Sequence, residues 1–185
     1  MSNHEVYRVD AMITKNPLWP GGLLIALCLT MPPAPARAAE YILQHNRSIE
    51  RPAQLNILAL VNQSSIGGAL CYSFPVQHAG LLPNLNDSLH LEGGVVTSYG
   101  YPSGRHNNFI ALTPFGGLRW DFHLTDAWTL FTTARLGWAI GFLDHYNGLT
   151  LAGTVGAIWR FDPLVSLRIE SGYGGLAQVG VSFPL

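Results

Sequence analysis

The sequence predicts an all-β protein, an eight-stranded antiparallel up-and-down transmembrane β-barrel. The first observation is composition: 11% of the residues are charged and 48% are apolar, whereas a water-soluble domain usually has about 25% charged residues. The second is that no apolar run beyond the N-terminal region reaches the roughly 18 residues that a membrane helix needs. The third is an alternation of apolar and polar residues, typical of strands with one face buried. Since lipid-facing backbone must be hydrogen-bonded in a helix or a closed sheet, these observations together predict a barrel.

The N-terminal region is expected to be a secretory signal peptide. Lys15 supplies a positive charge, and residues 21–30 (GGLLIALCLT) form an apolar segment of suitable length. Ala36-Arg37-Ala38 then provides the small residues of a cleavage site, and Met12 is an alternative start. The predicted domains are a signal peptide at 1–38, a periplasmic lead-in at 39–53 and the barrel at 54–185.

Eight segments after the lead-in are predicted as strands. Their approximate ranges are 54–62, 66–76, 88–99, 109–124, 127–142, 149–161, 165–173 and 176–183. The first alternates least clearly. In the second, Tyr72 lies between Cys71 and Ser73, and in the third Leu91 precedes Glu92. Apolar and polar residues therefore fall on opposite faces of these strands.

The fourth and fifth strands show the alternation most clearly. In the fourth, Leu118 and Trp120 share an apolar face, whereas Arg119 lies on the face that carries every charge. A short polar break, Thr125-Asp126, leads to the fifth strand. These strands are longer than the 5 or 6 residues that are about average in globular proteins, which favours a membrane-spanning hairpin.

The last three strands continue the pattern to the C-terminus. Trp159 alternates with Arg160 in the sixth strand, and Leu167 alternates with Arg168 in the seventh. Asp162-Pro163 between them predicts a tight turn. An even number of strands places both termini of the chain on one side, as in single-chain outer-membrane barrels.

Aromatic residues near both ends of the apolar stripes favour lipid on the outside. Trp128 and Trp138 are ten residues apart on one strand, which at a tilt near 45° corresponds to about 23 Å along the membrane normal. Outer-membrane barrels have an apolar band of about 25 Å between two aromatic girdles. The predicted girdle residues are Trp120, Trp128, Trp138, Trp159, Phe142 and Phe183.

The charged residues of the strands are few, of both signs, and confined to the opposite face. In a narrow eight-stranded barrel the interior is filled by side chains, and buried charges persist only when they are paired. We therefore predict an ion-pair network in the lumen. Its predicted members are Glu92, Arg119, Asp121, Arg135, Arg160, Arg168 and Glu170.

The eight alternating strands and the aromatic-ended last strand (LAQVGVSF) resemble the small outer-membrane barrels of the OmpA and OmpX type. The resemblance is architectural and covers about residues 54–185. It implies an outer-membrane location, contact with outer-membrane lipid, and reading of Val179, Val181 and Phe183 by the barrel-assembly machinery. The chain departs from that class by adding Pro184-Leu185 after the aromatic residue.

Two connections also depart from the expected lengths. Counting strands from the N-terminus makes residues 77–87 a periplasmic turn and residues 63–65 an outer loop. Periplasmic turns are usually short and outer loops long, but here the turn is long and the loop is short. Either the first strands are miscounted, or the longer segment folds against the mouth of the barrel.

Three functions are compatible with this pattern, and we favour a structural or interaction barrel with a plugged, charged lumen. Its partner would be an extracellular or envelope protein that contacts loops 100–108 and 143–148. The first alternative is an enzyme that modifies lipid or lipopolysaccharide, with Ser103, His106 and Asp144-His145 as weak candidates. The second is a soluble periplasmic barrel that binds an apolar ligand against an interior, Trp-rich face.

The remaining chemistry-bearing residues point to no further site. A net charge of −1 does not favour nucleic acid, and Cys71 is the only cysteine after the signal peptide, so an internal disulfide is excluded. Asp121 and His123 share a face, but two ligands do not make a metal site. We therefore expect no catalytic residues, no metal and no cofactor.

Overall fold

The computed structural model describes residues 51–62, 65–78, 80–82, 84–100, 109–142, 147–172 and 176–185. The predicted signal peptide and nearly all of the predicted lead-in lie outside this part of the chain. Within it, no helix is long and apolar enough to cross a membrane.

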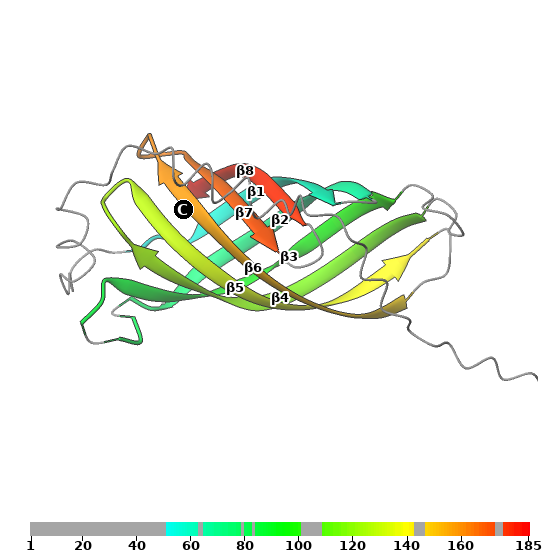
Figure 1. Cartoon of the computed structure of the whole chain (residues 1–185), viewed down its shortest axis with the longest axis horizontal. Helices are drawn as coiled ribbons and strands as arrows, with labels where there is room; N and C mark the ends of the chain where they lie inside the picture. The colour runs from blue at the N-terminus through cyan, green and yellow to red at the C-terminus, as the bar shows by residue number, and fades with distance from the viewer. Residues whose placement is uncertain are drawn as a thin grey trace, which may run out of the picture.

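The described residues form a closed barrel in which each strand pairs with the next and β1 pairs with β8 (Figure 1). All eight pairings are antiparallel. The predicted eight-stranded up-and-down barrel is thereby confirmed. The strands are β1 (Gln54–Asn62), β2 (Ser65–Gln77), β3 (Asp87–Gly100), β4 (Phe109–His123), β5 (Trp128–Gly141), β6 (Asn147–Arg160), β7 (Ser166–Gly172) and β8 (Ala177–Pro184).

The first and last strands close the barrel. Leu55 of β1 lies opposite Phe183 of β8, and the pairing continues to Val61 opposite Ala177. The start of β1 and the end of β8 therefore lie at one end of the barrel, which we call the termini end, and the opposite end is the far end. Closure removes the free sheet edges that would otherwise pair with other chains.

The wall of the barrel is uneven in height. The strands β3, β4, β5 and β6 contain 14, 15, 14 and 14 residues, whereas β7 and β8 contain 7 and 8. Figure 1 shows the long β4 and β5 crossing the molecule, with β6 between them and the shorter β7 and β8. The predicted ranges already show this difference, since 165–173 and 176–183 are shorter than 109–124, 127–142 and 149–161.

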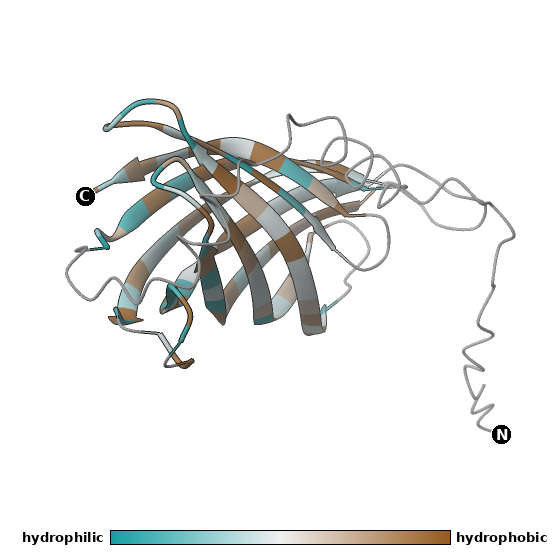
Figure 2. Cartoon of the chain, turned by 60° about the vertical axis from the view of Figure 1, so that its left-hand side comes forward, coloured by the Kyte–Doolittle hydropathy of each residue, from teal (hydrophilic) through white to brown (hydrophobic). Residues whose placement is uncertain are grey.

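Residues alternate between the outer wall and the lumen as the period of two requires. In β4, Leu118 is 47% exposed while Arg119 is fully buried. Bands of hydrophobic and hydrophilic residues accordingly alternate along the strands in Figure 2. Most large apolar side chains are on the outer wall and the charged ones of the strands are in the lumen, apart from Arg160 at its mouth. This is the reverse of the arrangement in a water-soluble barrel.

The long connection between β2 and β3 lies at the termini end. The backbone N–H of Leu81 and the Trp120 indole Nε1 both donate to Asp87 Oδ2, at 2.8 and 2.7 Å. The carbonyl of Asn86 accepts from the N–H of His123 at 2.9 Å. The first strands lie where the sequence places them, so they were not miscounted. The described contacts join the end of this connection to β3 and β4, while Leu81 and Leu82 are 51% and 40% exposed.

Candidate functional site

The strands direct a set of charged side chains into the lumen on the termini side of its middle. Glu92 comes from β3, Arg119 from β4 and Arg135 from β5, and their side chains are almost completely buried. Asp121 lies two residues after Arg119, and so points to the same side of β4. Arg168 and Glu170 have the same spacing on β7, and both are 0% exposed.

Glu92 is the centre of the network because it accepts hydrogen bonds from three arginines. Its Oε1 lies 2.8 Å from Nη1 of Arg168 and 3.3 Å from Nη1 of Arg119. Its Oε2 lies 3.0 Å from Nη2 of Arg135. A buried carboxylate in contact with several guanidinium groups is stabilised in its charged form, provided that every partner stays in place.

The other two carboxylates bind arginines that also bind Glu92. Arg119 binds Asp121 through two hydrogen bonds, from Nε to Oδ1 at 2.7 Å and from Nη2 to Oδ2 at 2.9 Å. Arg135 Nη2 lies 3.0 Å from Oε2 of Glu170, which also accepts from the Thr154 hydroxyl at 2.8 Å. Three arginines thus face three carboxylates, so the network carries no net charge.

Two aromatic rings fill the space around the guanidinium groups. The ring of Phe131 lies near two of them, with its centroid 4.6 Å from Cζ of Arg168 and 5.8 Å from Cζ of Arg119. Phe115 lies 5.1 Å from Cζ of Arg135. Such contacts stabilise a cation and exclude water from its flank. The described part of the lumen is therefore packed at this level.

Arg160 does not join the network, contrary to the sequence-based prediction. It is the last residue of β6, at the termini end, where its side chain is exposed. Its Nη1 donates to the carbonyl of Asp126 at 3.4 Å. Arg160 is on the inward-facing side of β6, as predicted. Because β6 ends at this residue, the guanidinium lies at the mouth of the barrel and not in its interior.

A second polar cluster at the termini end was not predicted as a group. Ser88 Oγ lies 2.9 Å from Nε2 of His123 and 3.1 Å from Nε2 of His90. Nδ1 of His123 lies 3.0 Å from the hydroxyl of Thr129. The sequence signal that could have found this cluster is the alternation, which places Ser88, His90 and His123 on the inner face of their strands. Among the described residues no three His, Cys, Asp or Glu side chains are grouped so that they could hold a metal ion.

The aromatic residues predicted as girdles lie on the outer wall near both ends. Towards the termini end, Trp128 stacks on Trp159 with ring centroids 5.7 Å apart, and Trp120 packs on Phe122 at 4.6 Å. Phe183 is partly exposed at the same end. Towards the far end, Trp138 and Phe142 are 51% and 58% exposed.

The residues considered for an enzymatic site cannot be placed. Ser103, His106 and Asp144-His145 lie outside the described residues. Most of the two loops proposed for partner contact, 100–108 and 143–148, also lies outside them; Gly100, Asn147 and Gly148 are their described residues.

No protein-family model and no curated protein matches this chain. Solved structures similar to it include one described as "De novo design of transmembrane beta-barrels", with a TM-score of 0.47 and 17% identity, covering 74% of this chain and 98% of that one. A de novo designed protein solved by solution NMR has a TM-score of 0.41 and 19% identity, over 75% and 98% of the two chains. Neisserial surface protein A has a TM-score of 0.42 and 15% identity, over 72% and 94%.

Proposed function

We propose that this chain is an outer-membrane β-barrel of structural or interaction type whose lumen is plugged. The observation that carries the proposal is the reversed distribution of polarity in the barrel wall. Leu151, Leu149 and Val155 on the outer face of β6 are 82%, 64% and 58% exposed. Arg168 and Glu170 on the inner face of β7 are 0% exposed.

This distribution is unfavourable in water and favourable in a bilayer. Each Å² of apolar surface left in water costs about 25 cal/mol relative to burial, and soluble monomers seldom expose large contiguous apolar patches. Enclosing charges is also expensive unless they are fully paired. A lipid environment removes the first cost because the outer wall then contacts acyl chains, and the ion pairs offset the second.

The lumen network supports a mechanical role over a conducting one. Glu92, Arg119, Arg168 and Glu170 occupy the interior and have almost no exposed surface. Each is held by at least one partner on another strand, such as Arg168 of β7 bound to Glu92 of β3. We infer that this network joins opposite walls of the barrel and blocks a continuous path through it.

The expected binding partners follow from a location in the outer membrane. The outer wall would contact outer-membrane lipid, with the aromatic residues at the interfaces. The barrel-assembly machinery would read β8, where Val179 is 48% exposed and Val181 lies on the same face. A protein partner, if one binds, would use the far-end connections between β3 and β4 and between β5 and β6.

A soluble ligand-binding barrel is less well supported. It requires the Trp-rich face to line the lumen, whereas Trp138 and Trp159 are 51% and 41% exposed on the outer wall. The described lumen holds charged, small and aliphatic side chains and the rings of Phe115 and Phe131, whereas the tryptophans of the strands face outward. For this reason we retain the membrane barrel as the conclusion.

A pair of arginine substitutions tests the membrane proposal. Val155 lies near the middle of β6, whereas Leu164, 72% exposed, lies in the connection between β6 and β7. In lipid, Val155→Arg should lower the free energy of unfolding by about 2–4 kcal/mol and Leu164→Arg by about 1 or less. The measurement is denaturant unfolding of the barrel from phosphatidylcholine vesicles, followed by Trp fluorescence.

The same pair distinguishes a soluble barrel. In water both positions are exposed surface, where a substitution usually changes stability by no more than about 0.5 kcal/mol. Equal and small effects of the two variants would therefore contradict the membrane proposal. Gel mobility of the unboiled and boiled protein in detergent gives an independent check, since a folded membrane barrel should run as a compact form until it is boiled.

A further inference from the structure

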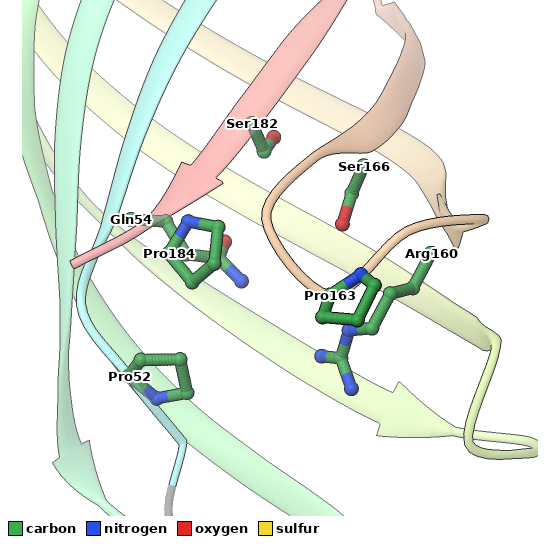
Figure 3. A pocket seen from close by; sticks show the side chains of 7 residues that line it. All are labelled: Pro52, Gln54, Arg160, Pro163, Ser166, Ser182 and Pro184. Atoms are coloured by element: carbon green, nitrogen blue, oxygen red, sulfur yellow. The ribbon is translucent and has the colours of Figure 1, made fainter.

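A cavity of about 210 Å³ lies at the termini end, at the mouth of the lumen. It is bounded by the start of β1, the end of β6, the start of β7 and the end of β8 (Figure 3). Its lining residues are Pro52, Gln54, Arg160, Pro163, Ser166, Ser182 and Pro184. The cavity does not continue into the charged network, because Asn56 and Arg119 beneath it are 0% exposed.

Arg160 provides the one cation in this lining. Its side chain extends past the ring of Pro163, and the guanidinium lies at the opening of the cavity (Figure 3). One of its amino groups, Nη1, contacts the Asp126 carbonyl at 3.4 Å, close to the limit of a hydrogen bond. The remaining N–H groups of the fork point away from that contact and can bind an acceptor.

Ser166 provides an unused donor deeper in the cavity. The residue is 5% exposed, and its hydroxyl has no hydrogen-bond partner among the described residues. In Figure 3 the oxygen points towards Pro163 and Arg160. The hydroxyl borders the cavity, so it can donate a hydrogen bond to a ligand that enters there.

Gln54 provides a third donor because its acceptor is already occupied. Its Oε1 accepts from Nη2 of Arg119 at 3.0 Å, which orients the amide and leaves the Nε2 side towards the cavity (Figure 3). Ser182 is not available in the same way, since its hydroxyl donates to Oδ1 of Asn56 at 2.6 Å.

We propose that this cavity binds a phosphate group. The lining contains one cation, two neutral donors and three proline rings, and it contains no carboxylate. Donors from β1, β6 and β7 approach from different directions, which suits the several oxygens of a phosphate. An arginine is well matched to such a ligand because its planar fork can bind two oxygens together. The volume exceeds that of one phosphate, so a phosphoester with a small substituent also fits.

The phosphate could belong to a soluble molecule or to a lipid headgroup. Trp159 and Phe161, which flank Arg160 in sequence, are 41% and 55% exposed on the outer wall. If the barrel spans a membrane, these rings place the cavity at headgroup level. The site itself depends only on the lining residues, so it stands whether or not the membrane proposal holds.

The experiment uses the full-length folded protein in a maltoside detergent, which contains no phosphate. Two probes are titrated by calorimetry: inorganic phosphate and dihexanoyl phosphatidic acid, each in low salt. We expect saturable binding of at least one probe. Binding of inorganic phosphate assigns the site to soluble ligands, whereas binding of the phosphatidic acid alone assigns it to a headgroup.

Three variants show whether binding occurs in this cavity. Arg160→Gln should weaken binding at least tenfold, because it removes a charge-assisted contact, and Ser166→Ala should weaken it a few-fold. Arg105→Gln makes the same charge change in the connection between β3 and β4 and should leave binding unchanged. The unboiled gel mobility of each variant verifies that it folds. Absence of saturable binding for both probes, or equal binding by the wild type and the folded Arg160→Gln variant, would overturn the proposal.

Discussion

The lumen is filled by long charged side chains in one half and by small or apolar side chains in the other. The charged half, towards the termini end, consists of Glu92, Arg119, Asp121, Arg135, Arg168 and Glu170. The apolar half, from the middle of the barrel to the far end, contains Leu58, Leu60, Ala69, Cys71, Ala111 and Ala139, together with one buried amide, Gln178. Val96 and Phe115 pack against the Leu58, Ala69 and Cys71 cluster.

The two halves tolerate change for different reasons. In the charged half each group needs a partner of opposite sign, so a substitution that preserves shape but removes a charge leaves another charge buried and unpaired. In the apolar half only volume and contact matter, so a substitution that preserves volume should be accepted. The charged half therefore restricts residue identity, whereas the apolar half restricts residue size.

Glu92→Gln should have the largest effect, because it keeps the shape of the side chain and removes the charge shared by three arginines. We expect the free energy of unfolding to fall by roughly 3–5 kcal/mol. Denaturant unfolding of the refolded barrel, followed by its gel mobility, measures the change.

A charge-balanced double variant is the control for Glu92→Gln. Adding Arg168→Met leaves Arg119 and Arg135 opposite Asp121 and Glu170, so part of the lost stability should return. If Glu92→Gln costs less than about 1 kcal/mol, a typical value for exposed pairs, the charged half does not depend on pairing.

Leu58→Ala tests the apolar half by removing volume. The side chain is 3% exposed, and its truncation should lower the free energy of unfolding by about 2–5 kcal/mol. Leu58→Met keeps the volume and should cost less than about 1.5 kcal/mol. The comparison with Glu92→Gln is direct, since both conservative variants preserve size. Equal losses for Leu58→Met and Glu92→Gln would remove the distinction between the halves.

Gly94→Ala tests how closely the wall of the lumen is packed beside this cluster. A Cβ at Gly94 would lie 2.3 Å from the Leu70 carbonyl oxygen and 2.7 Å from the Cβ of Cys71. At the outward Gly93 the nearest atom, the Phe115 carbonyl oxygen, is 3.9 Å away. We expect Gly94→Ala to lower the free energy of unfolding by about 1–3 kcal/mol and Gly93→Ala to have little effect. A greater loss for Gly93→Ala would show that the inner wall is the looser one.

The smallest effect is expected at Cys71, which is 1% exposed in the apolar half. Cys71→Ala removes one atom from a packed site and should lower the free energy of unfolding by about 1 kcal/mol. The wild-type thiol should react with a maleimide only after the barrel unfolds. Rapid labelling of the folded protein would show that water reaches the apolar half.

Much of the fold could be predicted because it depends on local alternation. Arg119 and Asp121 face the lumen, and Leu118 faces outward, because successive side chains of a strand point to opposite sides. Parity gave the correct side for Arg160 but not its place outside the network, since parity does not say where a strand ends relative to the mouth of the barrel. It also could not group Ser88 with His90 and His123, since Ser88 and His123 are 35 residues apart in the chain.

Strand number, strand order and the sidedness of each residue were therefore readable from the chain, because each is a property of neighbouring residues and of short connections. The ion-pair partner of each lumen residue could not be predicted from the chain. Arg168 reaches Glu92 across 76 residues only after β1 pairs with β8 and the sheet closes, which brings β3 and β7 to opposite sides of one lumen. Closure and register also determined the cavity at the mouth. These features depend on distances between distant segments, and alternation carries no information about such distances.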